Sequence, residues 1–149
     1  MGRIEHIYIS PNRGEPMIGI AEAEAIKDGG LRGDRYSNEK NRRSPDYQVT
    51  LIELEFIEAF SREYGLPLLP HEPRRNLVTV GVRLNELCGK RFFIGSAEFE
   101  GLELCEPCTL LAKRTYAEAL SFFVHKGGLR CRVIQGGQLK VGNEVLTNA

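Results

Sequence analysis

The sequence predicts a mainly β protein, a barrel of short strands with a few peripheral helices. Short runs rich in β-branched and aromatic residues, such as Asn76–Val82, Arg91–Ile94 and Ala97–Leu104, alternate with turns that contain glycine. Only a few stretches place apolar residues at helical spacing. Many short strands with regular turn signals are typical of a barrel or a sandwich.

The first half of the chain contains both periodicities. Arg3–Ile9 alternates apolar and polar residues and predicts a strand. Met17–Ile26 predicts a second extended run, although its Ala-Glu alternation also suits a helix. The remaining expected segments are a glycine-rich loop at 28–35, a polar excursion at 37–46, a short apolar run at Val49–Ile52, and a helix over Glu53–Tyr64 that Gly65 ends.

The second half is predicted to be mostly β. Proline residues prohibit regular structure across 66–73, and a helix is expected only over Tyr116–Val124. Three short strands are expected at Leu129–Ile134, Gln138–Val141 and Glu144–Leu146. The pairs Gly136-Gly137 and Gly142-Asn143 between them have the composition of tight hairpin turns.

The totals restrict the class of protein. A chain of 149 residues suits one domain, 1–149, and 42% hydrophobic with 27% charged residues suits a globular protein. Lys+Arg and Asp+Glu are both 20, whereas proteins that bind nucleic acid nonspecifically are usually basic, so no nucleic-acid partner is expected. No apolar run approaches a membrane span and the first residues do not form a secretory signal, so we expect no membrane contact and a cytoplasmic location. The 14 arginines outnumber the 6 lysines, and arginine is the better match for phosphate and carboxylate.

The four cysteines leave several chemistries open. Cys105 and Cys108 form one CxxC pair, which could serve a metal site, a redox dithiol or a single working thiol. Structural zinc usually takes two such pairs, and a thioredoxin-like dithiol needs a parallel α/β context that is not predicted here. Cys88 and Cys131 are expected to be small buried hydrophobic residues. Cys108 follows a proline at the end of a strand run, where a rigid scaffold could present a thiol.

Five motifs follow one another along about four fifths of the chain: GGLRGDRY (29–36), QVTLIE (48–53), RRNLVTVGVRLNELCGKRFFIGSAEFEG (74–101), CEPC (105–108) and GGLRCRVIQGGQLKVGNEV (127–145). In this order and spacing they resemble the MOSC domain, the module at the C-terminus of molybdenum-cofactor sulfurases. The resemblance implies a MOSC-type β-barrel of short strands with peripheral helices.

The resemblance also implies one working cysteine, Cys108, as the catalytic and metal-binding residue. Its expected role is to ligate the molybdenum of a bound molybdopterin, the molybdenum cofactor, or to carry sulfur as a persulfide. Molybdenum is held by soft sulfur ligands, and a cysteine thiolate is such a ligand. The pterin phosphate calls for arginines and backbone N–H groups. The expected cofactor-binding residues are Arg32, Gly33, Asp34, Arg35, Arg75, Asn76, His125 and Arg130.

Two functional classes remain at this point. The first is a molybdenum-cofactor or sulfur-carrier protein, with reduction of N-hydroxylated compounds as the reaction that the resemblance implies for an enzyme. No pyridoxal phosphate is expected on this chain, so sulfur transfer would need a separate cysteine desulfurase as partner. Redox chemistry would need a separate electron-donor reductase. The alternatives are a non-catalytic barrel that docks a partner enzyme, and a thiol–disulfide protein that uses Cys105 with Cys108.

Overall fold

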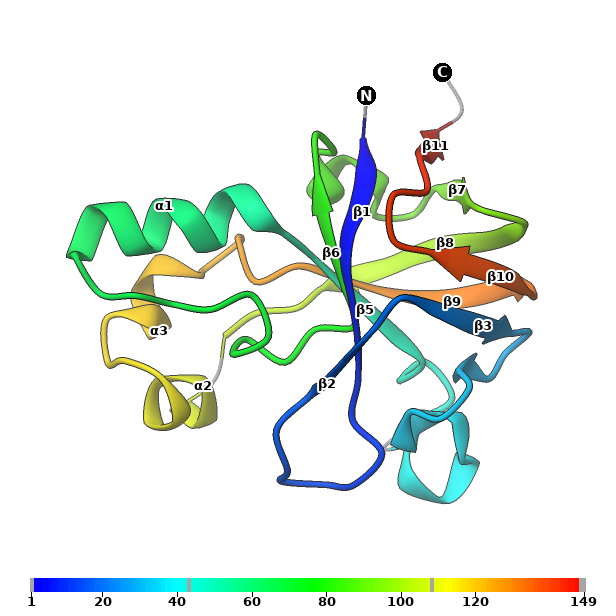
Figure 1. Ribbon diagram of the computed structural model, residues 1–149, viewed down its shortest axis with the longest axis horizontal. Helices are drawn as coiled ribbons and strands as arrows, with labels where there is room; N and C mark the ends of the chain where they lie inside the picture. The colour runs from blue at the N-terminus through cyan, green and yellow to red at the C-terminus, as the bar shows by residue number, and fades with distance from the viewer. Residues whose placement is uncertain (1, 43, 108, 148–149) are drawn as a thin grey trace.

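A computed structural model gives the structure of residues 2–42, 44–107 and 109–147 (Figure 1). Within these ranges, the longer sheet has the strand order β11-β7-β8-β9-β5-β6-β1-β2. Its strands are β1 (Arg3–Ile9), β2 (Ile18–Ile20), β5 (Val49–Glu53), β6 (Leu77–Val80), β7 (Arg91–Ile94), β8 (Ala97–Leu104), β9 (Leu129–Gln135) and β11 (Val145–Thr147). A smaller sheet has the order β10-β3-β4, with β3 (Glu22–Ile26), β4 (Gly30–Leu31) and β10 (Gly137–Lys140).

Two of the helices pack on one face of the longer sheet. The helices are α1 (Leu54–Tyr64), α2 (Thr109–Arg114) and α3 (Ala119–Phe122), with the 3-10 turns η1 (Arg35–Ser37), η2 (Glu39–Asn41) and η3 (Leu84–Leu87). Helix α1 connects β5 to β6, which pair in parallel. A parallel pair requires a crossover connection between its strands, and α1 forms it. Gly65 ends α1 in a left-handed conformation, as the sequence predicts.

Two apolar clusters lie on opposite sides of β5 and β6. Leu51 and Leu77 pack in the cluster enclosed by the two sheets, which also contains the stacked rings of Phe92 and Phe99. The next residues along the same strands, here Ile52, face the other way and pack beneath α1 and α3. This alternation follows from the period-two geometry of a strand buried on both faces.

The strands at the C-terminal end pair differently from the sequence-based expectation. The predicted hairpins at Gly136-Gly137 and Gly142-Asn143 are wrong, because β10 pairs with β3 and β11 pairs with β7. The glycines instead allow backbones to cross closely: a Cβ on Gly137 would lie 2.5 Å from the carbonyl carbon of Ser96. A pair of glycines between two short strands therefore marks a change of sheet here.

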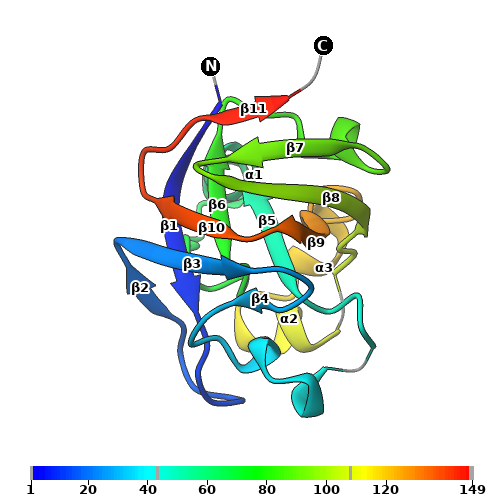
Figure 2. The same cartoon turned by 90° about the vertical axis from the view of Figure 1, so that its right-hand side faces the viewer.

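The predicted barrel is not confirmed. The longer sheet ends in β2 and β11, and within the described ranges the contact nearest to closure is an isolated bridge between Arg3 and Glu144. Figure 2 shows the smaller sheet lying across the open side of the longer one. The mainly β class and the peripheral helices are as predicted.

The predicted helix after residue 115 is shorter than expected, and an additional helix precedes it. The apolar stretch that follows Pro107 already forms α2, and α3 covers only Ala119–Phe122. In the part of the chain that the structure describes, no helix is long and apolar enough to cross a membrane.

Candidate functional site

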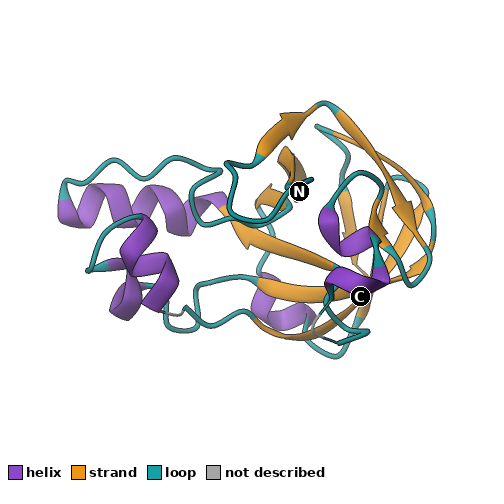
Figure 3. Cartoon of the chain, turned by 90° about the horizontal axis from the view of Figure 1, so that it is seen from below, coloured by secondary structure: helices purple, strands orange, loops and turns teal. Residues whose placement is uncertain are grey.

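A cavity of about 390 Å³ opens at the end of the sheet opposite both termini. Six segments distant in sequence surround it. They are the β1–β2 loop, the region around η1, the residues at the start of β5, the residues that enter β6, the stretch from the end of β8 through α2, and Arg130 in β9. Figures 1 and 2 show the loop, η1 and α2 gathered at this end, and Figure 3 views it directly. Its lining side chains include five arginines: Arg35, Arg74, Arg75, Arg114 and Arg130.

A buried hydrogen-bond network forms the floor of the cavity. Asn76 is 5% exposed; its Oδ1 accepts from the backbone N–H of Thr50 (3.1 Å), and its Nδ2 donates to the carbonyl of Tyr8 (3.1 Å) and to Asp34 Oδ1 (3.5 Å). Asp34 also accepts from the N–H of Ser10 at 2.8 Å. These bonds connect β5, β1 and the segment before η1, so Asn76 and Asp34 hold the site together.

The carboxyl group of Asp34 is buried in this network. Burial raises its pKa above the ordinary value, while the hydrogen bonds from Ser10 and Tyr36 and the charge of Arg35 act in the opposite direction. Gly33, which precedes it, has φ of 89° and turns the chain from β4 into this position. Asp34 is thus a structural carboxyl at the base of an arginine-rich cavity.

Arg74 enters the cavity from an unusual backbone conformation. Its φ is 62°, the left-handed region, which costs a residue with a side chain about 1–2 kcal/mol. The half-buried guanidinium donates to the hydroxyl of Ser10 (3.0 Å) and to the carbonyl of Glu15 (2.6 Å). Burial lowers its pKa, and the nearby charges of Arg114 and Arg35 lower it further.

Arg75 and the loop at 125–128 are connected. Arg75 Nε donates to the carbonyl of Gly127 at 2.9 Å. Gly127 in turn lies against the backbone of Cys105, since a Cβ on it would be 2.1 Å from the Cys105 carbonyl oxygen. The N–H of Cys105 donates to the carbonyl of Gly128 at 2.8 Å. The orientation of Arg75 therefore depends on the same loop that packs on the CEPC stretch.

The exposed loop residue His125 is held by the side chain of Glu106. Glu106 accepts from the backbone N–H of His125 at 2.8 Å, and its other oxygen lies 3.1 Å from His125 Nδ1. His125 has φ of 60°, and its carbonyl accepts from Asn85 at 2.8 Å. With a side chain 73% exposed, His125 contacts the edge of the CEPC stretch and is not among the residues that line the cavity.

Two arginines stack on tyrosines at the cavity wall. The guanidinium of Arg35 lies 4.5 Å from the ring centre of Tyr36, and that of Arg130 lies 3.9 Å from the ring centre of Tyr47. Arg130 also pairs with Glu103 at 3.2 Å. Stacking fixes the planes of the guanidinium groups and leaves N–H donors at their edges for a ligand.

The cysteines occupy different environments. Cys108 lies outside the described residues, while Cys105, Glu106 and Pro107 before it and Leu110 after it line the cavity. Cys105 itself is 3% exposed. Among the described residues, no group of three or more His, Cys, Asp and Glu side chains is placed to hold a metal ion.

The expectation for the other two cysteines is half correct. Cys131 is fully buried, and burial raises its thiol pKa well above the ordinary value. Cys88 is exposed at the end of η3, where its Sγ donates to the carbonyl of Leu102, so the prediction that it is buried is wrong. The short 3-10 turn puts its side chain on the surface rather than in the core.

The structure brings together five of the sequence-predicted site residues: Asp34, Arg35, Arg75, Asn76 and Arg130 all line the cavity. Arg32 and Gly33 are not among the residues that line it, and Arg32 pairs with Glu24 at 2.8 Å on the surface. Sequence reasoning did not select Arg74, Arg114, Tyr36 or Tyr47. Tyr36 is the last residue of the GGLRGDRY motif, so the sequence could have assigned it to the site. Arg114 belongs to no such motif, and its place at the cavity follows only from the position of α2.

The family follows from comparison with known proteins. The model of the MOSC domain matches residues 38–146 of this sequence. The chain belongs to the MOSC domain family. No curated protein sequence matches it significantly.

Solved structures share this fold. The YUAD protein from Bacillus subtilis superposes with a TM-score of 0.84 at 17% identity, covering 97% of this chain and 94% of that one. YiiM from Geobacillus stearothermophilus gives 0.76 at 17% identity, covering 100% and 76%. YiiM from Escherichia coli gives 0.73 at 20% identity, covering 100% and 70%. At these identities the likeness shows the fold alone.

Proposed function

We propose that this MOSC domain binds the molybdenum cofactor in the arginine-lined cavity, with Cys108 as metal ligand or sulfur carrier. The observation that carries the proposal is the surplus of positive charge in the cavity. Arg35, Arg74, Arg75 and Arg114 line it, and none of them pairs with a carboxylate in the described part of the chain. Such a site favours an anionic ligand.

The residues present fit the anionic part of molybdopterin. A guanidinium presents a planar fork of donors that matches phosphate oxygens, and charge-assisted bonds of this kind are about twice as strong as neutral ones. Molybdopterin supplies a soft, sulfur-ligated metal when it is bound, and a protein thiolate is a suitable further ligand. Thiolates form where positive charge is near, and the described residues on both sides of Cys108 line the same positive cavity.

Each of this chain's own groups has a distinct part in the proposal. Arg75 and Arg130 are held by Gly127 and Tyr47, so they present donors without paying much ordering entropy at binding. The side chains of Asp34 and Asn76 form hydrogen bonds with backbone groups and so position the wall of the cavity. Reduction of N-hydroxylated compounds, or transfer of sulfur, would need a separate electron-donor reductase or a cysteine desulfurase as partner.

The decisive measurement is the molybdenum content per chain. The protein is produced in a host that makes molybdopterin, purified without oxygen, and assayed by elemental mass spectrometry beside Cys108→Ser and the control Cys105→Ser. We expect near-stoichiometric metal in the wild type and in the control, and its loss in Cys108→Ser. Equal metal in both variants would contradict the role of Cys108.

The sulfur-carrier form of the proposal has its own readout. Intact-mass analysis after incubation with a cysteine desulfurase and cysteine would show an added sulfur atom on the wild type and on Cys105→Ser. The same addition on Cys108→Ser would exclude Cys108 as the carrier.

A further inference from the structure

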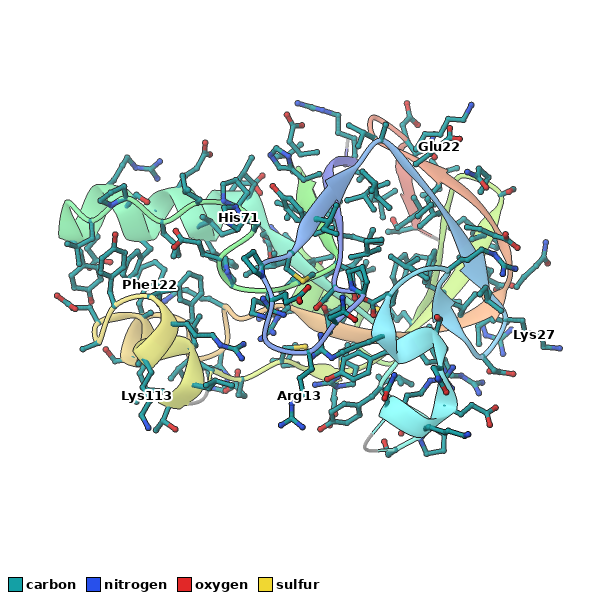
Figure 4. All side chains as sticks on the ribbon, turned by 60° about the horizontal axis from the view of Figure 1, so that its bottom comes forward. Arg13, Glu22, Lys27, His71, Lys113 and Phe122 are labelled. Carbon is teal, nitrogen blue, oxygen red and sulfur yellow. The ribbon has the colours of Figure 1, made fainter. Side chains whose placement is uncertain are left out.

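The chain around α3 carries apolar side chains on two sides. Backbone hydrogen bonds between residues three or four apart continue the helical turns over 116–126. Ala119 and Phe123 are buried in the apolar cluster beneath α1 and α3. Phe122 points toward α1, where its ring meets those of Phe60 and Tyr64 (Figure 4). The opposite side of these helical turns faces away from the core.

A groove of about 550 Å³ lies on that opposite side, between the α3 segment and the CEPC stretch. Its lining residues are Glu106, Pro107, Ala117, Leu120, Ser121 and Val124. The last four lie three or four positions apart, the spacing that places side chains on one face of a helix. Leu120 is 37% exposed and Val124 is 45% exposed. These four residues, the α3 stripe, therefore present a mostly apolar helical face to solvent, a feature that marks protein contacts.

The α3 stripe is complementary to a second copy of itself. In an antiparallel pair related by a two-fold axis, Ala117 of one copy lies opposite Val124 of the other. Leu120 of one copy then lies opposite Ser121 of the other, so each large side chain meets a small one and the two stripes interdigitate. A parallel pair would instead place Leu120 against Leu120 and Ala117 against Ala117, which fills space less evenly.

The charges around the α3 stripe favour the same arrangement. Glu118 lies at one end of the stripe and Lys126 at the other. Antiparallel packing brings the acidic end of each copy to the basic end of the other, whereas parallel packing brings like charges together. The whole chain has a formal net charge of zero at pH 7, so two copies do not repel each other at long range.

We propose that this chain forms an antiparallel, two-fold symmetric dimer through the α3 stripe and the groove beside it. A two-fold contact uses the same patch on both copies, which the self-complementary stripe satisfies. Interfaces of standard size contain about 20–30 residues a side, whereas six residues line this groove. The dimer is therefore expected to be weak and to depend on protein concentration.

The groove and the arginine-lined cavity share a wall. Glu106 and Pro107 line both of them. A second copy in the groove contacts this stretch from the side opposite the cavity and leaves the cavity itself open. The dimer goes beyond the proposed function and does not rest on it.

Sedimentation equilibrium of the full chain between about 10 µM and about 1 mM measures the association. A reductant is present throughout, because the exposed thiol of Cys88 could otherwise link two copies. We expect a reversible monomer–dimer equilibrium for the wild type. Leu120→Glu places an unpaired charge in the contact of both copies and should weaken the association at least about tenfold. Because Leu120 lies on the surface, the circular dichroism spectrum should stay as in the wild type.

The matched control is Leu146→Glu. Leu146 is 51% exposed in β11, at the end of the molecule that carries both termini (Figure 1). This variant is expected to associate as the wild type does. Equal weakening in the two variants would overturn the dimer. A wild type that stays monomeric over the whole range would overturn it as well, and would leave the groove to a different protein.

A pair of substitutions tests the antiparallel arrangement itself. Ala117→Lys and Val124→Glu should each weaken the dimer, because each places a charge against an apolar side chain. In the variant that carries both, charges of opposite sign face each other twice across the contact. We expect this double variant to associate about fivefold more tightly than either single variant, and the gain to disappear at high salt. No gain at low salt would rule out the proposed dimer.

Discussion

Asn76 is the single residue on which the floor of the cavity depends most. Its side chain joins the backbone of β5, the carbonyl of Tyr8 in β1 and the carboxyl of Asp34. Asn76→Ala leaves buried backbone groups without partners, so we expect the free energy of unfolding to fall by about 2–4 kcal/mol. Urea denaturation measures this loss.

A matched control for this loss is available in the same fold. Asn12 is exposed, and within the described residues its side chain bonds only to Glu15. Asn12→Ala is expected to change stability by no more than about 0.5 kcal/mol. Equal effects of the two substitutions would show that the buried network contributes little.

Asp34 makes a pH-dependent contribution whose sign follows from its raised pKa. The folded state binds its proton more tightly than the unfolded chain, whose Asp pKa is about 3.9. Its contribution to stability is therefore fully present below that value and is lost as pH rises through the folded pKa.

Comparison with Asp34→Asn, which does not titrate, isolates this contribution. We expect the stability advantage of the wild type over the variant to be larger near pH 4 than near pH 7, in urea denaturation at both values. An advantage that grows with pH would mean that the hydrogen bonds from Ser10 and Tyr36 outweigh burial.

Elements with local signals were predictable from the sequence. Alternation located β1 at its observed bounds, strand-forming composition between glycine turns located β7 and β8, and Gly65 located the end of α1. The partners of β10 and β11 were not predictable in this way, because the choice of β3 and β7 depends on contacts far apart in sequence. Local turn composition favoured hairpins, and the tertiary pairing overrode it.

The loop at 125–128 is the element that connects Arg75 to the CEPC stretch. A methyl group on Gly127 would lie 2.1 Å from the carbonyl oxygen of Cys105, so Gly127→Ala must separate the two backbones. We expect a loss of about 1–3 kcal/mol in stability from overpacking. Molybdenum content should fall as well, because Arg75 and the segment around Cys105 move together.

Gly14→Ala provides the comparison for this element. Gly14 has φ of 83° but nothing within 4 Å of the added methyl group, so only backbone strain of about 1 kcal/mol is expected. Molybdenum content should stay at the wild-type level. If Gly14→Ala and Gly127→Ala lower the molybdenum content equally, the packing of the loop at 125–128 on Cys105 does not control metal binding.

At the scale of the whole molecule, the cavity is a product of the fold rather than of any one motif. Its wall comes from residues near 10, 35, 75, 105 and 130. The resemblance selected Arg75, Asn76 and Arg130 because each belongs to a recognisable motif. Arg114 belongs to none, and it reaches the cavity only through the position of α2, which the sequence did not predict.

The same strands that support the cavity also join the two apolar clusters. Leu51 in β5 packs in the first cluster and its neighbour Ile52 in the second, so neither cluster can open without breaking β5. We therefore expect one cooperative thermal transition, with equal calorimetric and van't Hoff enthalpies. Phe99→Ala in the first cluster and Phe60→Ala in the second should each cost about 3–5 kcal/mol. Each substitution should shift that single transition to a lower temperature in differential scanning calorimetry, whereas two resolved transitions in Phe60→Ala would show that the helical side unfolds independently of the sheets.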